Sequence, residues 1–190
     1  MKIAGLFPGQ GSQAVGMGKA FFEQDSAAKD IFLAADDALG FSLSKLCFEG
    51  PIEELTLTNN AQPAILSASY VSFVLSGVTP DAVAGHSLGE YTALVAAKSL
   101  SFNDAVSLVH KRGSYMQEAV EPGAGTMLAV MGASPEEIQA AIDKVENGVV
   151  EIANLNCPGQ TVVAGNIEGT KAFSEVIESK IIPLNVSAPF

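Results

Sequence analysis

A serine between glycines lies at the centre of the segment "VAGHSLGEYTALVAA", residues 83–97. The five residues "GHSLG" fit the G-x-S-x-G pattern of a nucleophile elbow, in which a strand turns sharply into a helix and exposes the serine hydroxyl. Ser87 would then be the nucleophile, and the backbone N–H of Leu88 would face the oxyanion that develops on a substrate carbonyl. The alternative is a serine that only caps a helix. The strand expected before it and the helix expected after it favour the elbow.

A serine hydroxyl becomes a good nucleophile only when a base removes its proton. His86 adjoins Ser87, but consecutive residues of an elbow point in different directions, so we expect a structural or substrate-binding role for it. His110 lies on a predicted helix, and we expect an ordinary solvated or half-buried helical residue there. No histidine follows His110 in the sequence, whereas a serine hydrolase carries its histidine late in the chain. The sequence therefore supplies no obvious base.

Two further segments bear on this site. The loop "PGQGSQ", residues 8–13, follows the first predicted strand, and the N–H of Gln10 is the candidate for the second oxyanion donor. With Ala14 the loop also matches a dinucleotide-binding glycine pattern, but no acidic residue ends a second strand about 20 residues later, which disfavours that reading. Arg112 is the only arginine of the chain. Its planar guanidinium could bind a carboxylate through two hydrogen bonds, although an arginine taken alone is more often an exposed helical charge.

Composition limits the function classes. The 190 residues, 48% of them hydrophobic and 16% charged, indicate one large or two small globular domains. The net charge of −11 and the scattered basic residues argue against nucleic acid and an anionic membrane surface as partners. No apolar window approaches the roughly 20 residues that span a bilayer. Cys47 and Cys157 stand far apart, so we expect reduced thiols, no metal site and a cytoplasmic protein.

The order of predicted elements indicates an α/β fold. Apolar spacing and turn residues predict strands at residues 2–7 and 81–85 and helices at residues 26–39, 59–77, 88–100 and 101–120. After a hinge-like stretch at 121–125 the order becomes β-α-β-β-α-β over residues 126–186, which is the ferredoxin-like unit. Strands alternating with helices in the first part imply a parallel sheet.

Six collinear segments resemble the malonyl-CoA:acyl-carrier-protein transacylase family: "FPGQGSQAVGMG", "AQPAIL", "AGHSLGEYTALVAA", "RGSYMQEAV", "IANLNCPGQTVVAG" and "IPLNVSAPF". The resemblance implies an α/β-hydrolase-like large subdomain with an inserted ferredoxin-like small one. It places the N-terminal part of the large subdomain at residues 1–124, the small subdomain at 125–186 and the return to the large subdomain at 187–190.

The resemblance also implies the site and its chemistry. Ser87 would accept the acyl group, Gln10 and Leu88 would hold the oxyanion, and Arg112 would bind the free carboxylate of malonate. His86 and Gln62 would lie near the substrate. Malonyl-CoA and acyl carrier protein are then the substrate and partner, and no cofactor is expected.

Relatives carry the catalytic histidine directly after "SAPF", followed by about a hundred further residues, as the resemblance implies. The sequence given ends at Phe190, so that histidine is expected just after it and is absent here; relatives also carry a few more residues near 179–180. Phe190 itself would favour malonyl over methylmalonyl. Two alternatives stay open: an α/β serine hydrolase, and a catalytically incomplete fragment that binds CoA thioesters or carrier protein. Fatty-acid and polyketide synthesis are both compatible with the sequence.

Overall fold

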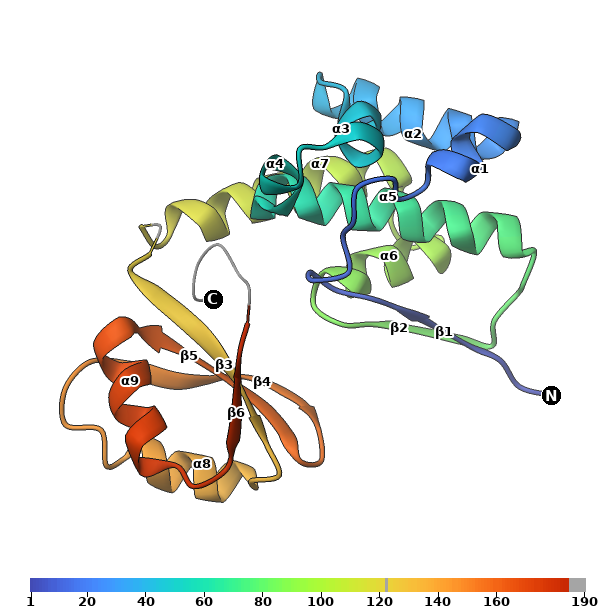
Figure 1. Cartoon of the computed structure of the whole chain (residues 1–190). Coiled ribbons are helices and arrows are strands. Elements are labelled where there is room, and N and C mark those ends of the chain that lie inside the picture. The colour runs from blue at the N-terminus through green and yellow to red at the C-terminus, as the bar shows by residue number, and fades with distance from the viewer. Residues whose placement is uncertain (122, 185–190) are drawn as a thin grey trace. The chain divides into compact units, whose positions relative to one another are not determined.

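The computed structural model describes residues 1–121 and 123–184 (Figure 1). Its elements confirm the predicted α/β class, and the chain divides into two compact units, Met1–Tyr115 and Met116–Phe190. Helix α7 (Phe102–Glu118) crosses this division, since it begins in the first unit and ends in the second. The predicted segment 187–190 lies outside the described residues.

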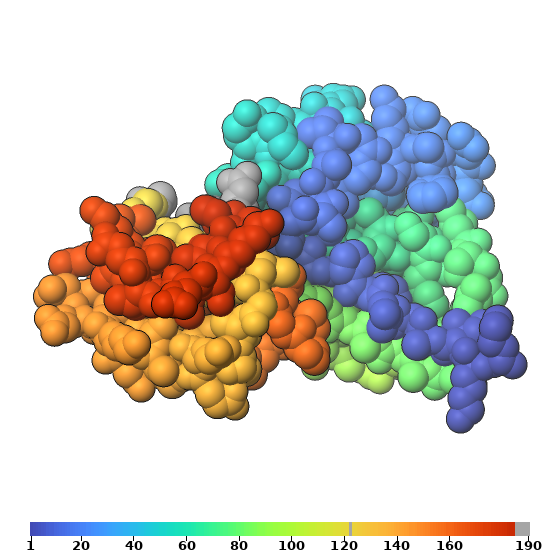
Figure 2. All heavy atoms as spheres, turned by 60° about the horizontal axis from the view of Figure 1, so that its bottom comes forward, coloured from blue at the N-terminus to red at the C-terminus, as the bar shows by residue number. Residues whose placement is uncertain are grey.

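The first unit contains a pair of parallel strands. β1 (Ala4–Phe7) pairs with β2 (Ala82–Gly85) in a register that places Phe7 opposite Gly85. Both strands were predicted, and their parallel pairing agrees with the expected α/β order. The N-terminal segment lies along the surface in Figure 2, and Leu6 of β1 is 77% exposed. Because the two strands are parallel, their carboxyl ends meet at one edge of the pair, which is where α/β folds place their binding sites.

Helices form most of the first unit. The amphipathic α2 has the bounds that the sequence predicts, and the N-cap Asp25 accepts hydrogen bonds from the backbone N–H groups of Ala27 and Ala28. The core joins Phe32 of α2 to Ile65 of α5 and Val106 of α7, all three at most 1% exposed. The helices are α1 (Lys19–Gln24), α2 (Ser26–Leu39), α3 (Leu43–Glu49), α4 (Ile52–Thr56), α5 (Thr58–Ser76), α6 (Leu88–Ala96) and α7.

The second unit is a four-stranded antiparallel sheet with two helices. The strands are arranged in the order β4-β5-β3-β6, so the first and last strands of the unit lie side by side. Val130 and Val163 of the sheet pack with Ile138 of α8 and Phe173 of α9 in one apolar cluster. The elements are β3 (Gly125–Met131), α8 (Pro135–Ile142), β4 (Val150–Cys157), β5 (Gln160–Asn166), α9 (Ile167–Val176) and β6 (Lys180–Pro183). The predicted β-α-β-β-α-β order is present.

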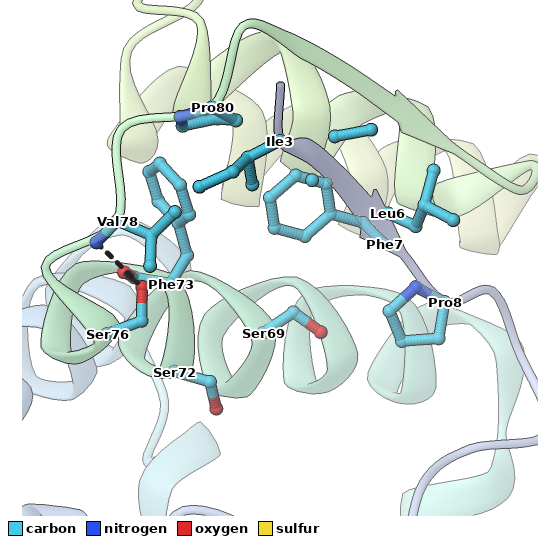
Figure 3. Close-up of a pocket in the computed structure, with 12 residues that line it drawn as sticks. Ile3, Leu6, Phe7, Pro8, Ser69, Ser72, Phe73, Ser76, Val78 and Pro80 are labelled. Carbon is cyan, nitrogen blue, oxygen red and sulfur yellow. Dashed lines mark hydrogen bonds between the residues drawn. The ribbon is translucent and has the colours of Figure 1, made fainter. Parts of the chain in front are cut away.

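An apolar hollow of about 450 Å³ lies on the first unit beside β1 (Figure 3). Phe7 and Phe73 meet there edge to face, with ring centroids 5.7 Å apart. The hydroxyls of Ser72 and Ser76 donate to carbonyl groups of their own helix, so they leave the walls apolar. None of the residues that the sequence singled out for chemistry lines this hollow.

The two cysteines differ in their surroundings, and a labelling experiment separates them. Burial, with a smaller contribution from the charge of Asp36, raises the pKa of the Cys47 thiol to about 12, whereas Cys157 is exposed. Because the thiolate is the reactive form, we expect a thiol reagent at pH 8 to modify Cys157 quickly and Cys47 only after unfolding. The Cys157→Ser variant should then show almost no labelling in the native state. Equal labelling rates for the two native thiols would contradict this prediction.

Candidate active site at the turn between β2 and α6

Ser87 occupies a sharp turn between strand β2 and helix α6. The strand ends at Gly85 and the helix begins at Leu88. Ser87 has φ 51° and ψ −106°, a backbone conformation that residues with a side chain seldom adopt and that costs about 1–3 kcal/mol. The serine is exposed while Leu88 behind it is buried. The structure therefore contains the strained strand-turn-helix geometry that the "GHSLG" pattern predicts.

The two outer glycines of the pattern make this turn possible. A Cβ atom on Gly85 would lie 1.9 Å from the carbonyl carbon of Gly89, and one on Gly89 would lie 2.2 Å from the carbonyl oxygen of Phe7. Backbone atoms cannot move away as a flexible side chain can, so neither position accepts a larger residue without displacing β1 or α6. The glycines therefore hold Ser87 against the end of β1.

We expect Gly89→Ala to lower the free energy of unfolding of the chain by about 3 kcal/mol, or to prevent folding, because overpacking against backbone is costly. Gly5→Ala is the matched control, since a Cβ on this β1 glycine would meet side-chain atoms rather than backbone, the nearest of them Cγ1 of Val83 at 3.3 Å. Denaturant unfolding of both variants measures the difference. Equal losses of stability in the two variants would contradict the steric role given to Gly89.

The loop after β1 reaches the elbow at Gly9. A Cβ on Gly9 would lie 2.8 Å from Nδ1 of His86, so the absence of a side chain lets the loop pack against the elbow. Gln10 follows directly, and its side-chain amide donates to the hydroxyl of Thr58 at 3.2 Å. Leu88 is the first residue of α6, where a backbone N–H has no carbonyl of its own helix to bond. The loop that carries Gln10 thus packs against the elbow that carries Ser87 and Leu88.

Arg112 of α7 binds Ser87 directly. Its Nη2 donates to Oγ of Ser87 at 3.1 Å, and its Nη1 donates to Oε1 of Gln62 at 2.7 Å. The guanidinium also lies over the ring of Tyr91, 5.7 Å from its centroid. Gln62 is fully buried, so the arginine is held on its inner side while its outer side faces the exposed serine. A fixed positive charge beside a nucleophile suits a substrate that carries a negative charge near its reacting carbonyl.

All the site residues that the sequence predicts lie in the first unit. The structure brings Ser87, Arg112 and Gln62 into one hydrogen-bonded chain, and it places His86 against the loop that carries Gln10. The prediction that a histidine base follows Phe190 lies outside the described residues, as does Phe190 itself. Sequence reasoning missed two partners, Thr58 and Tyr91. Their signals were slight: Tyr91 comes four residues after Ser87, and Thr58 precedes the "AQPA" segment.

A shallow, mainly apolar hollow of about 290 Å³ lies next to the elbow and is lined by Leu6, Phe7, Ala84, Gly85 and His86. Within residues 1–121 and 123–184, no group of three or more histidine, cysteine or acidic side chains could hold a metal ion. In the same ranges no helix is both long and apolar enough to cross a membrane.

Comparison with known proteins links this geometry to a family. The chain matches the acyl transferase domain family over residues 6–186. The malonyl CoA-acyl carrier protein transacylase of Bacillus subtilis (strain 168) is 54% identical over 198 residues, which cover 100% of this chain and 62% of that relative. The corresponding enzyme of Clostridium perfringens has a solved structure with a TM-score of 0.92 and 41% identity, covering 100% of this chain and 62% of that one.

A third relative is a malonyl-transacylase solved in complex with its holo type II polyketide acyl-carrier protein, with a TM-score of 0.91 and 39% identity over 100% of this chain and 64% of that chain. The chain thus spans less than two thirds of the length of these relatives. Because the family match includes the elbow, both loops around it and Arg112, this chain belongs to the acyl transferase domain family.

Proposed function

We propose that Ser87 accepts a malonyl group from malonyl-CoA and passes it to the phosphopantetheine thiol of an acyl carrier protein. The observation that carries this proposal is the hydrogen bond from Nη2 of Arg112 to Oγ of Ser87. It sets a fixed cation within reach of any acyl group bound to the serine. The relatives named as malonyl CoA-acyl carrier protein transacylases support the same substrate and acceptor.

The reaction runs in two balanced halves. Oγ of Ser87 attacks the thioester carbonyl carbon as its proton passes to a base, and the C–S bond then breaks, so that CoA leaves as the thiol with that proton. In the second half the carrier's thiol loses its proton to the base and attacks the malonyl ester. The Ser87 oxygen leaves and recovers the proton. Because the thioester supplies an activated acyl group, we expect no cofactor.

The backbone N–H groups of Gln10 and Leu88 are the proposed oxyanion donors. They come from the loop after β1 and from the first residue of α6, and each half-reaction passes through a tetrahedral intermediate with a negative oxygen. His86 is proposed to line the substrate side of the elbow. For the base we propose the histidine that the family resemblance places directly after the "SAPF" segment.

Arg112 and Gln62 are proposed to select the acyl group. The free carboxylate of malonate can bind the two Nη groups of the guanidinium in parallel, in place of the contact with the serine hydroxyl. Gln62 keeps the guanidinium oriented, since its Oε1 accepts from Nη1 at 2.7 Å. An acetyl group would leave the arginine without its carboxylate partner and should react more slowly.

We also propose a type for each of the two subdomains. The parallel β1–β2 pair followed by an elbow supports an α/β-hydrolase-like subdomain for residues 1–124. The strand order β4-β5-β3-β6 with two helices supports a ferredoxin-like subdomain for residues 125–186. Residues 187–190 would return to the first subdomain. We propose a cytoplasmic protein, in keeping with its two free cysteines and with carrier-protein substrates.

The acceptor distinguishes this proposal from a serine hydrolase. The test uses a fusion protein in which residues 1–190 are followed by the part of the Bacillus subtilis relative that lies beyond the matched region. After malonylation and removal of free malonyl-CoA, we expect the acyl-serine to persist in buffer for minutes and to be consumed within seconds when holo acyl carrier protein is added. Equal loss with and without the carrier would support a hydrolase and contradict the proposal.

The same experiment on residues 1–190 alone tests the alternative of a catalytically incomplete fragment. Binding of malonyl-CoA without acylation by this chain, together with acylation by the fusion, would identify residues 1–190 as a binding portion that needs the added segment for turnover. Acylation of both proteins would assign the whole first half-reaction to the chain itself.

A further inference from the structure

The first turns of helix α5 contain a proline that removes one backbone hydrogen bond. Pro63 is the sixth residue of this helix and has no N–H to donate. In a regular helix that N–H would bond the carbonyl oxygen four residues earlier, which belongs to Asn59. A proline ring also crowds this carbonyl and turns it away from the helix axis. The carbonyl of Asn59 therefore needs a donor from elsewhere.

His110 of helix α7 supplies that donor. Its Nδ1 lies 2.8 Å from the carbonyl oxygen of Asn59, 51 residues away in sequence. Since a carbonyl oxygen can only accept, the proton of this hydrogen bond must be on Nδ1 of the imidazole. The ring also packs against Phe41, with centroids 5.7 Å apart, so the side chain is held from a second side.

The contact lies next to a close approach of α7 to α5. A Cβ on Gly113 of α7 would lie 2.5 Å from Cα of Asn59, so the two helices touch through backbone at this point. One residue before Gly113, Arg112 bonds Gln62, the residue that precedes Pro63. His110 thus bonds the acceptor of the missing hydrogen bond, and Arg112 bonds the residue next to Pro63.

We propose that His110 is a positioning residue that replaces the N–H absent from Pro63. By holding the first turn of α5 against α7, it fixes Gln62, and Gln62 in turn orients the guanidinium of Arg112 beside Ser87. The inference that the helix contact depends on His110 stands on the geometry alone. Its consequence for malonyl binding rests on the proposed function.

A double-mutant cycle on the 190-residue chain tests the helix contact. His110→Phe keeps a ring of similar shape but removes the donor, and we expect it to reduce the folding equilibrium constant roughly tenfold, because a carbonyl loses its partner. In the Pro63→Ala background, which restores the helical N–H, the same substitution should cost about twofold or less. His110→Asn, which can place an amide N–H near the position of Nδ1, should recover part of the loss. An equal loss in both backgrounds would overturn the proposal.

A second measurement covers the case in which Pro63→Ala fails to fold. Nitrogen-15 spectra of the wild-type imidazole at neutral pH should show the proton on Nδ1 of His110. A neutral ring that carries its proton on Nε2 would overturn the contact by itself.

The fusion protein tests the consequence for the site. His110→Phe should raise the malonyl-CoA concentration needed for half-maximal acylation several-fold and change the corresponding acetyl-CoA concentration little. His110→Asn should recover part of the loss for malonyl-CoA. If wild-type fusion does not react with malonyl-CoA, the proposed function fails while the cycle still decides the helix contact. If wild-type reacts and His110→Phe affects both acyl groups equally, the positioning role is wrong.

Discussion

Replacing Ser87 by alanine is expected to abolish the covalent malonyl adduct of the fusion protein. Oγ of Ser87 is the only atom to which the proposed first half-reaction attaches the acyl group. Nucleophile substitutions in enzymes of this type cost about 10⁴-fold or more in rate, because the chemistry has no substitute atom. Intact-protein mass spectra before and after brief mixing with malonyl-CoA measure the adduct directly.

Two features of the structure make Ser87→Ala a clean comparison. Alanine is smaller than serine and meets the same backbone restriction at positive φ, so the elbow should keep its shape. The exposed Cys157 is a second nucleophile that could carry an acyl group, and Cys157→Ser serves as the matched control. An adduct that survives in Ser87→Ala but disappears in Cys157→Ser would contradict the assignment of the nucleophile.

Replacing Arg112 by alanine is expected to remove the preference for malonyl-CoA over acetyl-CoA. Truncating one partner of a close charge pair costs about 3 kcal/mol, which is roughly two orders of magnitude in the rate of malonyl transfer. Acetyl transfer should change much less, because an acetyl group has no carboxylate for the guanidinium to bind. Competition between the two thioesters, read as the ratio of the two acyl-enzyme masses, measures the selectivity.

Arg112→Lys separates the charge of this residue from its shape. Lysine keeps a positive charge but lacks the planar pair of Nη groups that contacts Ser87 and Gln62 together. We expect this variant to recover only a small part of the malonyl preference. A lysine variant as selective as wild type would show that the positive charge alone, and not the planar pair of Nη groups, selects the substrate.

Local patterns predict the elements that are long or strongly patterned. Helix α2 has the predicted bounds because its apolar spacing and its Asp25 cap act within the same stretch of chain. The helices α1, α3 and α4 were not predicted, since each has only five to seven residues, too few to show a helical period. In strand β4 (Val150–Cys157), register shifts at Ile152–Asn154 and Leu155–Cys157 interrupt the alternation, so the local pattern does not fix its bounds.

In the candidate site, features held within a few residues were predictable from the sequence, whereas contacts between distant residues were not. The elbow was predictable, because the two glycines and Ser87 carry its geometry within five residues. The bond from Arg112 to Gln62 joins residues 50 positions apart, and only the packing of α7 on α5 creates it. The contact of His110 with Asn59 has the same origin, and the sequence indicated nothing more than an ordinary helical histidine.

The most direct test of the proposed acyl transfer is a crystal structure of the fusion protein trapped with malonyl-CoA. We expect continuous density from Oγ of Ser87 to a malonyl group whose free carboxylate lies about 2.7–2.9 Å from both Nη atoms of Arg112. A malonyl group attached elsewhere, or a carboxylate turned away from Arg112, would contradict it.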